Sequence, residues 1–173
     1  MGMTDHRIAL EASLALAVDR IGDPQPAIYA RLFARHPAME AEFWRDTSGR
    51  IRGEMLARSL EMALDLAAPH APNGGWENQG WGGAFLATEA VTHDAYGINR
   101  AVFADFLPII AAVMAEAGGD GFTPAMAAAW DVVLARAAAV LAALPGSSMA
   151  ARVIDVEDVL PPVSQRGAFF PQR

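Results

Sequence analysis

The chain has 173 residues, a net charge of −7 and no cysteine. This length suits one domain with a sizeable core, and the negative charge argues against nucleic acid as the main partner, because phosphate binding needs a basic face. Without cysteine there are no disulfides, thiolate metal sites or thiol nucleophiles, so histidines, carboxylates and tyrosine hydroxyls are the strong metal ligands available.

Charged residues interrupt every apolar run of the sequence. The best runs, such as 106–117, fall short of the roughly 20 residues that a membrane span requires. The N-terminus lacks the basic start, apolar centre and small-residue cleavage site of a secretion signal. We therefore expect a cytoplasmic protein that does not enter the membrane.

Apolar residues in the first part of the chain recur at helical spacing. A first helix is predicted around residues 8–18 and ends at Gly22, since glycine commonly follows the last turn of a helix. Pro26 suits the first turn of a second helix, where its missing N–H costs little. Pro37 forces a boundary at the preceding residue, and one short further helix fits residues 38–43.

A long helix is predicted over residues 50–67, with Leu56 among the residues on its inward side. Residues 68–80 are rich in proline, glycine and asparagine, which indicates a loop. A short helix follows over 84–93 and is broken at Gly97. This part of the chain therefore reads as a long helix, a loop and a short helix.

Two long helices complete the predicted domain. The first runs over residues 99–117 with an asparagine cap and a bend at Pro108, and the second runs over 123–144 behind a threonine cap. No strand pattern competes, so the fold class is all-α, with one domain over 1–144. Residues 145–173 mix charges with prolines and are expected to form an extended or partly disordered tail.

Four short motifs in a fixed order resemble the globin family, most closely its bacterial single-domain and flavohaemoglobin-type branch. They are the runs 28–37 and 93–98, Phe43, and the pair 129–130, and the resemblance spans about residues 5–144. It implies a globin-like fold, in which the helices that the family letters A, B, C, E, F, G and H surround a haem pocket. Here a C-terminal extension follows.

The resemblance also implies a site. His93 would be the axial ligand of the iron of haem b (iron protoporphyrin IX), Tyr29 would donate to a bound diatomic gas, oxygen or nitric oxide, and Phe43 would pack flat against the haem. A histidine near a helix C-terminus can donate its other ring N–H to the carbonyl one turn back, here that of Glu89. That bond would fix the tautomer and orient the ligating nitrogen.

The family's distal position on the long helix is less regular in this chain. It falls on Arg52 when Leu56 is placed on the apolar residue one turn later, or on Gly53 after a slip of one residue. The guanidinium of Arg52 would either reach a bound ligand or turn outward to a haem propionate. The outward pose is favoured, because burying an unpaired guanidinium is costly.

Flavohaemoglobins carry a tyrosine ten residues after the axial histidine and pair it with a glutamate. Here Phe103 stands at that position, and no glutamate is expected to restore the pair. Reversible gas binding is therefore favoured over nitric oxide dioxygenase activity, which would need a separate reductase because no flavin or nicotinamide domain follows. A haem-free globin-fold module that acts through protein contacts is the third hypothesis.

Overall fold

The computed structural model describes residues 6–69 and 80–145. Within these residues the chain is helical, with no strand, which confirms the all-α prediction. The elements are α1 (His6–Ile21), α2 (Gln25–Arg35), α3 (Ala38–Glu42), α4 (Arg50–Ala67), α5 (Gly80–Ala95), α6 (Arg100–Gly118), the short 3-10 helix η2 (Gly119–Gly121) and α7 (Pro124–Ala143). Nearly all of the predicted 68–80 loop and of the predicted tail lies outside the described residues, so the domain boundary stays a prediction.

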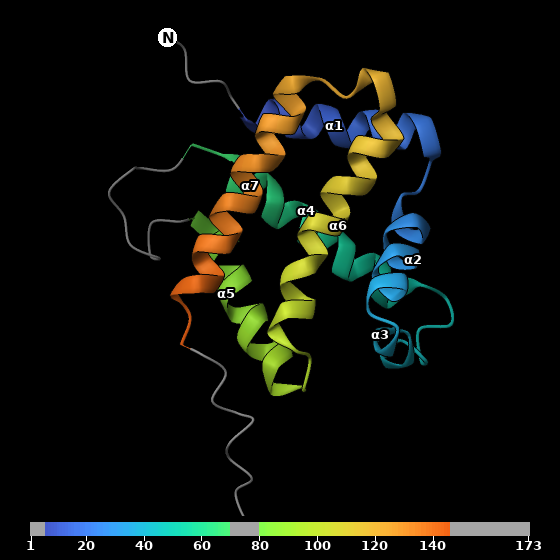
Figure 1. The fold of residues 1–173 in the computed structure, drawn as a ribbon, viewed down its shortest axis with the longest axis vertical. Coiled ribbons are helices and arrows are strands. Elements are labelled where there is room, and N and C mark those ends of the chain that lie inside the picture. Colours follow the sequence, from blue (N-terminus) through green and yellow to red (C-terminus); the bar gives the residue numbers. More distant parts are fainter. Residues whose placement is uncertain (1–5, 70–79, 146–173) are drawn as a thin grey trace, which may run out of the picture.

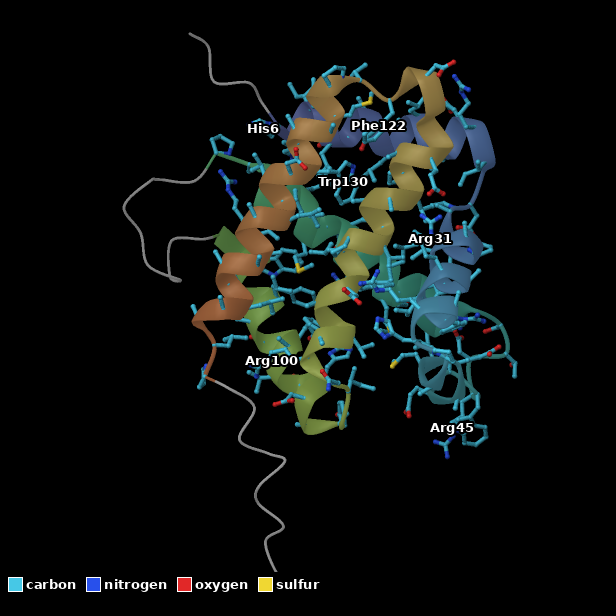
Figure 2. The ribbon with its side chains drawn as sticks, in the orientation of Figure 1. His6, Arg31, Arg45, Arg100, Phe122 and Trp130 are labelled. Carbon is cyan, nitrogen blue, oxygen red and sulfur yellow. The ribbon has the colours of Figure 1, made fainter. Side chains whose placement is uncertain are left out.

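The two longest helices, α6 and α7, form a pair that turns back on itself at η2, and α1 crosses both (Figure 1). Helix α4 lies behind them, in contact with α1, α5 and α7. Helix α2 packs beside α6, where Arg31 pairs with Glu116 at 2.7 Å (Figure 2). At one end of the bundle, α4, α5 and α6 lie together with α2 and α3.

Several helix ends follow from local sequence signals. The chain turns at Gly22 with φ of 70°, and its N–H donates to the carbonyl of Val18. The side chain of Asn99 accepts from Ala101 N–H at 2.8 Å and caps α6. Thr123 caps α7 in the same way. These ends lie where the sequence places them, because glycine turns and side-chain caps act within a few residues.

Helix α5 begins earlier than predicted, at Gly80 instead of residue 84. Glycine pairs usually indicate a loop, but Gly82 serves a packing role here. A Cβ atom added to Gly82 would lie 2.8 Å from the carbonyl oxygen of Met62 on α4. The N–H of Gly82 also donates to the carboxylate of Asp65 at 2.7 Å. The missing side chain therefore lets α5 approach α4 closely at this point.

A buried polar pair ties α1 to α7 in the core. Trp130, labelled in Figure 2, points inward from α7, and its indole N–H donates to the hydroxyl of Ser13 at 3.0 Å. The Ser13 hydroxyl in turn donates to the carbonyl of Leu10 at 2.7 Å. Both polar groups are thereby satisfied in an otherwise apolar core.

The expectation that no segment is long enough to span a membrane is wrong. Residues 100–121 and α7 are long and apolar enough to do so by length and composition. This is weak evidence for a membrane, because the core helices of proteins that never enter one meet the same criterion. Both helices here pack against α1.

Candidate functional site

A cavity of about 360 Å³ opens at the end of the bundle enclosed by α4, α5 and α6. Most of the residues that line it are apolar, and three of them carry a charge, Glu54, Arg58 and Glu89. Four phenylalanine rings form much of the wall: Phe43, Phe85, Phe103 and Phe106. A concave, largely apolar site with a few polar groups suits a flat apolar cofactor better than a polar metabolite.

Helices α4 and α5, which come close together at Gly82, both line the cavity. Helix α5 contributes residues spaced by one turn, namely Phe85, Glu89 and His93. Helix α4 contributes Met62 nearest the close approach, then Ser59 and Arg58, then Met55 and Glu54. His93 therefore lines the cavity from α5 and Met55 lines it from α4.

His93 lies in the last turn of α5 and its side chain is 24% exposed. Its Nδ1 lies 2.8 Å from the carbonyl oxygen of Glu89, which confirms the predicted hydrogen bond. A carbonyl oxygen can only accept, so Nδ1 carries the proton of the neutral ring and Nε2 keeps its lone pair. The ring of Phe103 lies against the imidazole with the centroids 4.8 Å apart.

The side chain of Glu89 also lies near His93. Its carboxylate is 3.6 Å from Nδ1, too long for a hydrogen bond but close enough for electrostatic attraction. Glu89 therefore brings a carboxylate near His93, although it cannot restore the tyrosine–glutamate pair because Phe103 has no hydroxyl. The sequence offered the signal, because positions four residues apart are neighbours on a helix.

Tyr29 lines the same cavity from α2 and is 2% exposed. Its ring packs against those of Phe33, Phe43 and Phe106 at centroid distances of 5.9, 5.4 and 5.5 Å. Burial raises the pKa of its hydroxyl well above the usual range and outweighs the opposing charge of Arg52. The hydroxyl therefore stays protonated and donates, at 3.0 Å, to the backbone carbonyl of Arg52.

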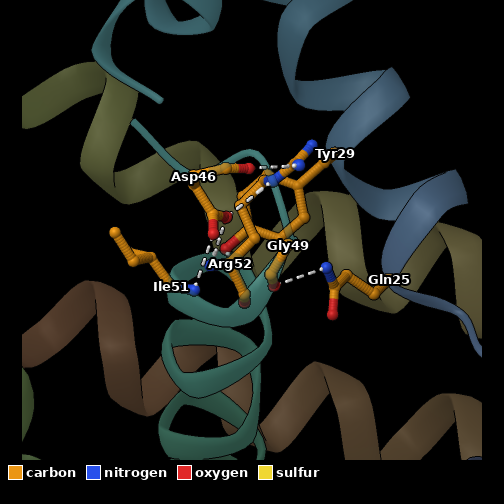
Figure 3. A network of polar contacts seen from close by, with 6 residues as sticks. All are labelled: Gln25, Tyr29, Asp46, Gly49, Ile51 and Arg52. Atoms are coloured by element: carbon orange, nitrogen blue, oxygen red, sulfur yellow. Dashed lines mark hydrogen bonds and ion pairs between the residues drawn. The ribbon is translucent and has the colours of Figure 1, made fainter. Parts of the chain in front are cut away.

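That carbonyl belongs to a polar network around the start of α4 (Figure 3). The carboxylate of Asp46, with 1% of its side chain exposed, accepts from the N–H groups of Ile51 and Arg52 and from Nε of Arg52. Burial alone would raise the pKa of Asp46, but these donors together hold it below its usual range. Asp46 was not singled out from the sequence, although an aspartate shortly before a helix often accepts from its first N–H groups.

The structure corrects the expected distal residues. Arg52 does not line the cavity; its guanidinium turns outward to the carboxylate and carbonyl of Asp46. Leu56 is 5% exposed and packs in the core. Met55 lines the cavity instead. Neighbouring residues of a helix point about 100° apart, so placing the helix by Leu56 selected the face toward the core and missed the face toward the cavity.

A family model described as Globin matches residues 26–141, more than half of the chain. The matched segment contains Tyr29, Phe43, Met55 and His93. Neither a search of curated proteins nor a search of solved structures found a match.

Proposed function

The chain belongs to the globin family, and we propose that it binds haem b in this cavity and reversibly takes up a diatomic gas at the iron. His93 carries the proposal. Its Nδ1–H is committed to the Glu89 carbonyl, so the Nε2 lone pair is available to the cavity that the ring lines. A neutral imidazole oriented in this way is what haem iron needs on one face.

The other residues of the cavity suit the rest of the cofactor. When bound, haem supplies an iron atom with one face open to a gas. The rings of Phe43, Phe85 and Phe106 offer apolar surface to the porphyrin and exclude water. Arg58 lines the cavity, and its side chain is 58% exposed, so we place a haem propionate near it. Arg58 takes over the role that Arg52 cannot fill, because Arg52 is held by the buried Asp46, whereas Arg58 pairs with the exposed Glu61.

Tyr29 is the hydrogen-bond donor that we propose for the bound gas. Its hydroxyl already donates to the Arg52 carbonyl, so it must leave that acceptor to reach a ligand. A hydrogen bond contributes about 1 kcal/mol net in either place, and somewhat more where the acceptor carries charge. Bound oxygen, which carries partial negative charge, therefore competes for this donor better than a neutral gas does. The tyrosine at this position favours assignment to the single-domain and flavohaemoglobin-type branch of the family, which carries a tyrosine there.

Nitric oxide dioxygenase activity is the second candidate. Dioxygen, nitric oxide and one electron from a separate reductase would yield nitrate. Phe103 cannot supply the hydroxyl that flavohaemoglobins have beside the axial histidine, but the Glu89 carboxylate lies 3.6 Å from Nδ1 and favours electron donation by the imidazole. Steady consumption of nitric oxide with an added reductase would distinguish this activity from simple binding.

Hemin titration of the purified protein tests the proposal. We expect one haem per chain and a Soret band that shifts when dithionite and carbon monoxide are added. His93→Ala should remove the axial bond and change the spectrum, and added imidazole should restore it. His36→Ala is the matched control, because His36 pairs with Asp105 and does not line the cavity. No Soret band after hemin addition would leave a haem-free globin fold.

A further inference from the structure

The cavity that His93 lines also contains thioether sulfur, which is a soft ligand for iron. Three methionines line the cavity: Met39 of α3, and Met55 and Met62 of α4. We propose that the sulfur of Met55 binds the iron opposite His93 when no gas is present. The inference rests on the proposed haem binding and concerns this chain's own sixth ligand.

The register of α4 against α5 favours Met55 over Met62, whereas Met39 lies on the short α3, outside this pair of helices. From the close approach at Gly82, one-turn steps along α5 lead to Phe85, Glu89 and His93. The same steps run along α4 from Met62 through Ser59 to Met55. His93 stands about 16 Å along its helix from Gly82, and Met55 about 10 Å along α4 from Met62. Met62, beside the close approach, is much farther from the level of His93.

The other donors on the described wall are less suited to iron. The Tyr29 hydroxyl is engaged by the Arg52 carbonyl, and the Ser59 hydroxyl donates to the Met55 carbonyl at 2.8 Å. Glu54 is exposed and would bring a charge into an apolar cavity. Among the described lining residues His93 carries the single imidazole. A methionine is neutral, flexible and apolar, so its sulfur can reach the iron without a buried charge.

Methionine ligation has two measurable consequences. Paired with histidine, a thioether favours ferrous over ferric iron and raises the reduction potential of the haem. It also competes with the gas, because only the fraction of molecules with an open iron can bind. If about one molecule in ten is open, removing the sulfur should strengthen carbon monoxide binding about tenfold. The protein would then bind gas only at concentrations that displace Met55.

Optical spectra of the reconstituted full-length protein test this directly. We expect six-coordinate low-spin ferrous haem, and in the ferric form the weak far-red charge-transfer band of methionine-ligated iron. Met55→Leu, which nearly conserves volume, should give five-coordinate high-spin ferrous haem, a lower reduction potential and about tenfold tighter carbon monoxide binding. Met39→Leu and Met62→Leu are the matched controls and should keep the wild-type spectrum.

The outcomes separate this inference from the proposed function. A wild-type protein that binds one haem but is five-coordinate, or whose spectrum is unchanged by Met55→Leu, overturns the methionine ligand and leaves haem binding intact. Loss of the low-spin spectrum in Met39→Leu or Met62→Leu instead would also overturn it. A protein that takes up no hemin overturns the proposed function and this inference together. If Met55→Leu fails to fold, absence of the far-red band in the wild-type protein still overturns the inference, and a band retained in both Met39→Leu and Met62→Leu supports Met55.

Discussion

The hydroxyl of Tyr29 and the carbonyl oxygen of Arg52 lie 3.0 Å apart, so the tyrosine of α2 is hydrogen-bonded to the first turn of α4. The turn that carries this carbonyl is held by Asp46, whose carboxylate accepts from two backbone N–H groups and from the Arg52 guanidinium. The donor proposed for a bound gas therefore has a structural role in the absence of that gas. Substitutions at the two ends of this network should separate the two roles.

Tyr29→Phe removes the hydroxyl and keeps the ring. Oxygen should leave the variant about tenfold faster, since the hydroxyl contributes about 1 to 3 kcal/mol as a donor to a partly charged ligand. Without haem, the free energy of unfolding of the variant should be lower than that of the wild type by about 0.5 to 1.5 kcal/mol, because the hydrogen bond to the Arg52 carbonyl is lost. Stopped-flow oxygen release and urea unfolding measure the two effects. A lower free energy of unfolding with an unchanged rate of oxygen release would mean that the hydroxyl stays bonded to the Arg52 carbonyl.

Asp46→Asn should make the free energy of unfolding depend less on pH in the acid range. In the folded protein the pKa of Asp46 is lowered, because its hydrogen-bond donors outweigh the effect of burial. The unfolded chain therefore binds the proton more readily. The carboxylate's contribution is complete above its ordinary pKa of about 4 and is lost as the pH falls below it.

Urea unfolding between neutral and strongly acid pH measures this contribution. The Asp46→Asn variant should be less stable at neutral pH and should lose less stability on acidification. Asp120→Asn is the control, since Asp120 is exposed in η2. Parallel pH profiles for wild type and Asp46→Asn would contradict the assigned role.

Gly82→Ala should destabilise the protein and weaken haem binding. The added methyl group would meet the Met62 carbonyl at 2.8 Å, and backbone cannot yield as a flexible side chain can. Overpacking of this kind costs about 1 to 3 kcal/mol. Gly53→Ala on α4 is the matched control. Its Cβ would meet only the Gln25 side-chain oxygen at 3.0 Å, and alanine is the better helix former by about 1 kcal/mol. Equal losses of stability in the two variants would argue against a tight approach at Gly82.

Ser13→Ala should cost more stability than the loss of one small hydroxyl suggests. It leaves the indole N–H of Trp130 buried without an acceptor, which costs about 1 to 3 kcal/mol. In a background of Trp130→Phe that penalty disappears, so the two substitutions should not be additive. A double-mutant cycle measured by urea unfolding gives the coupling. Additive effects would show that the hydrogen bond contributes nothing to stability.

Local sequence was enough to predict most helix ends and the orientation of His93. Gly22, Asn99 and Thr123 end or cap helices through contacts within a few residues, so their effect is visible in the chain itself. The bond from His93 to the Glu89 carbonyl spans one helical turn and was predictable for the same reason. Four motifs in order were enough to indicate the family, which the match over residues 26–141 then established.

Tertiary packing decided the rest of the site. Helix α4 turns one face, with Leu56, toward the core and another, with Met55, toward the cavity. Helical spacing alone cannot rank them, because both repeat with the same period. Only the approach of α5 at Gly82 and the bond from Tyr29 to Arg52 select which face opens on His93. These contacts join residues about 20 apart, and they depend on how helices cross, which local spacing does not encode.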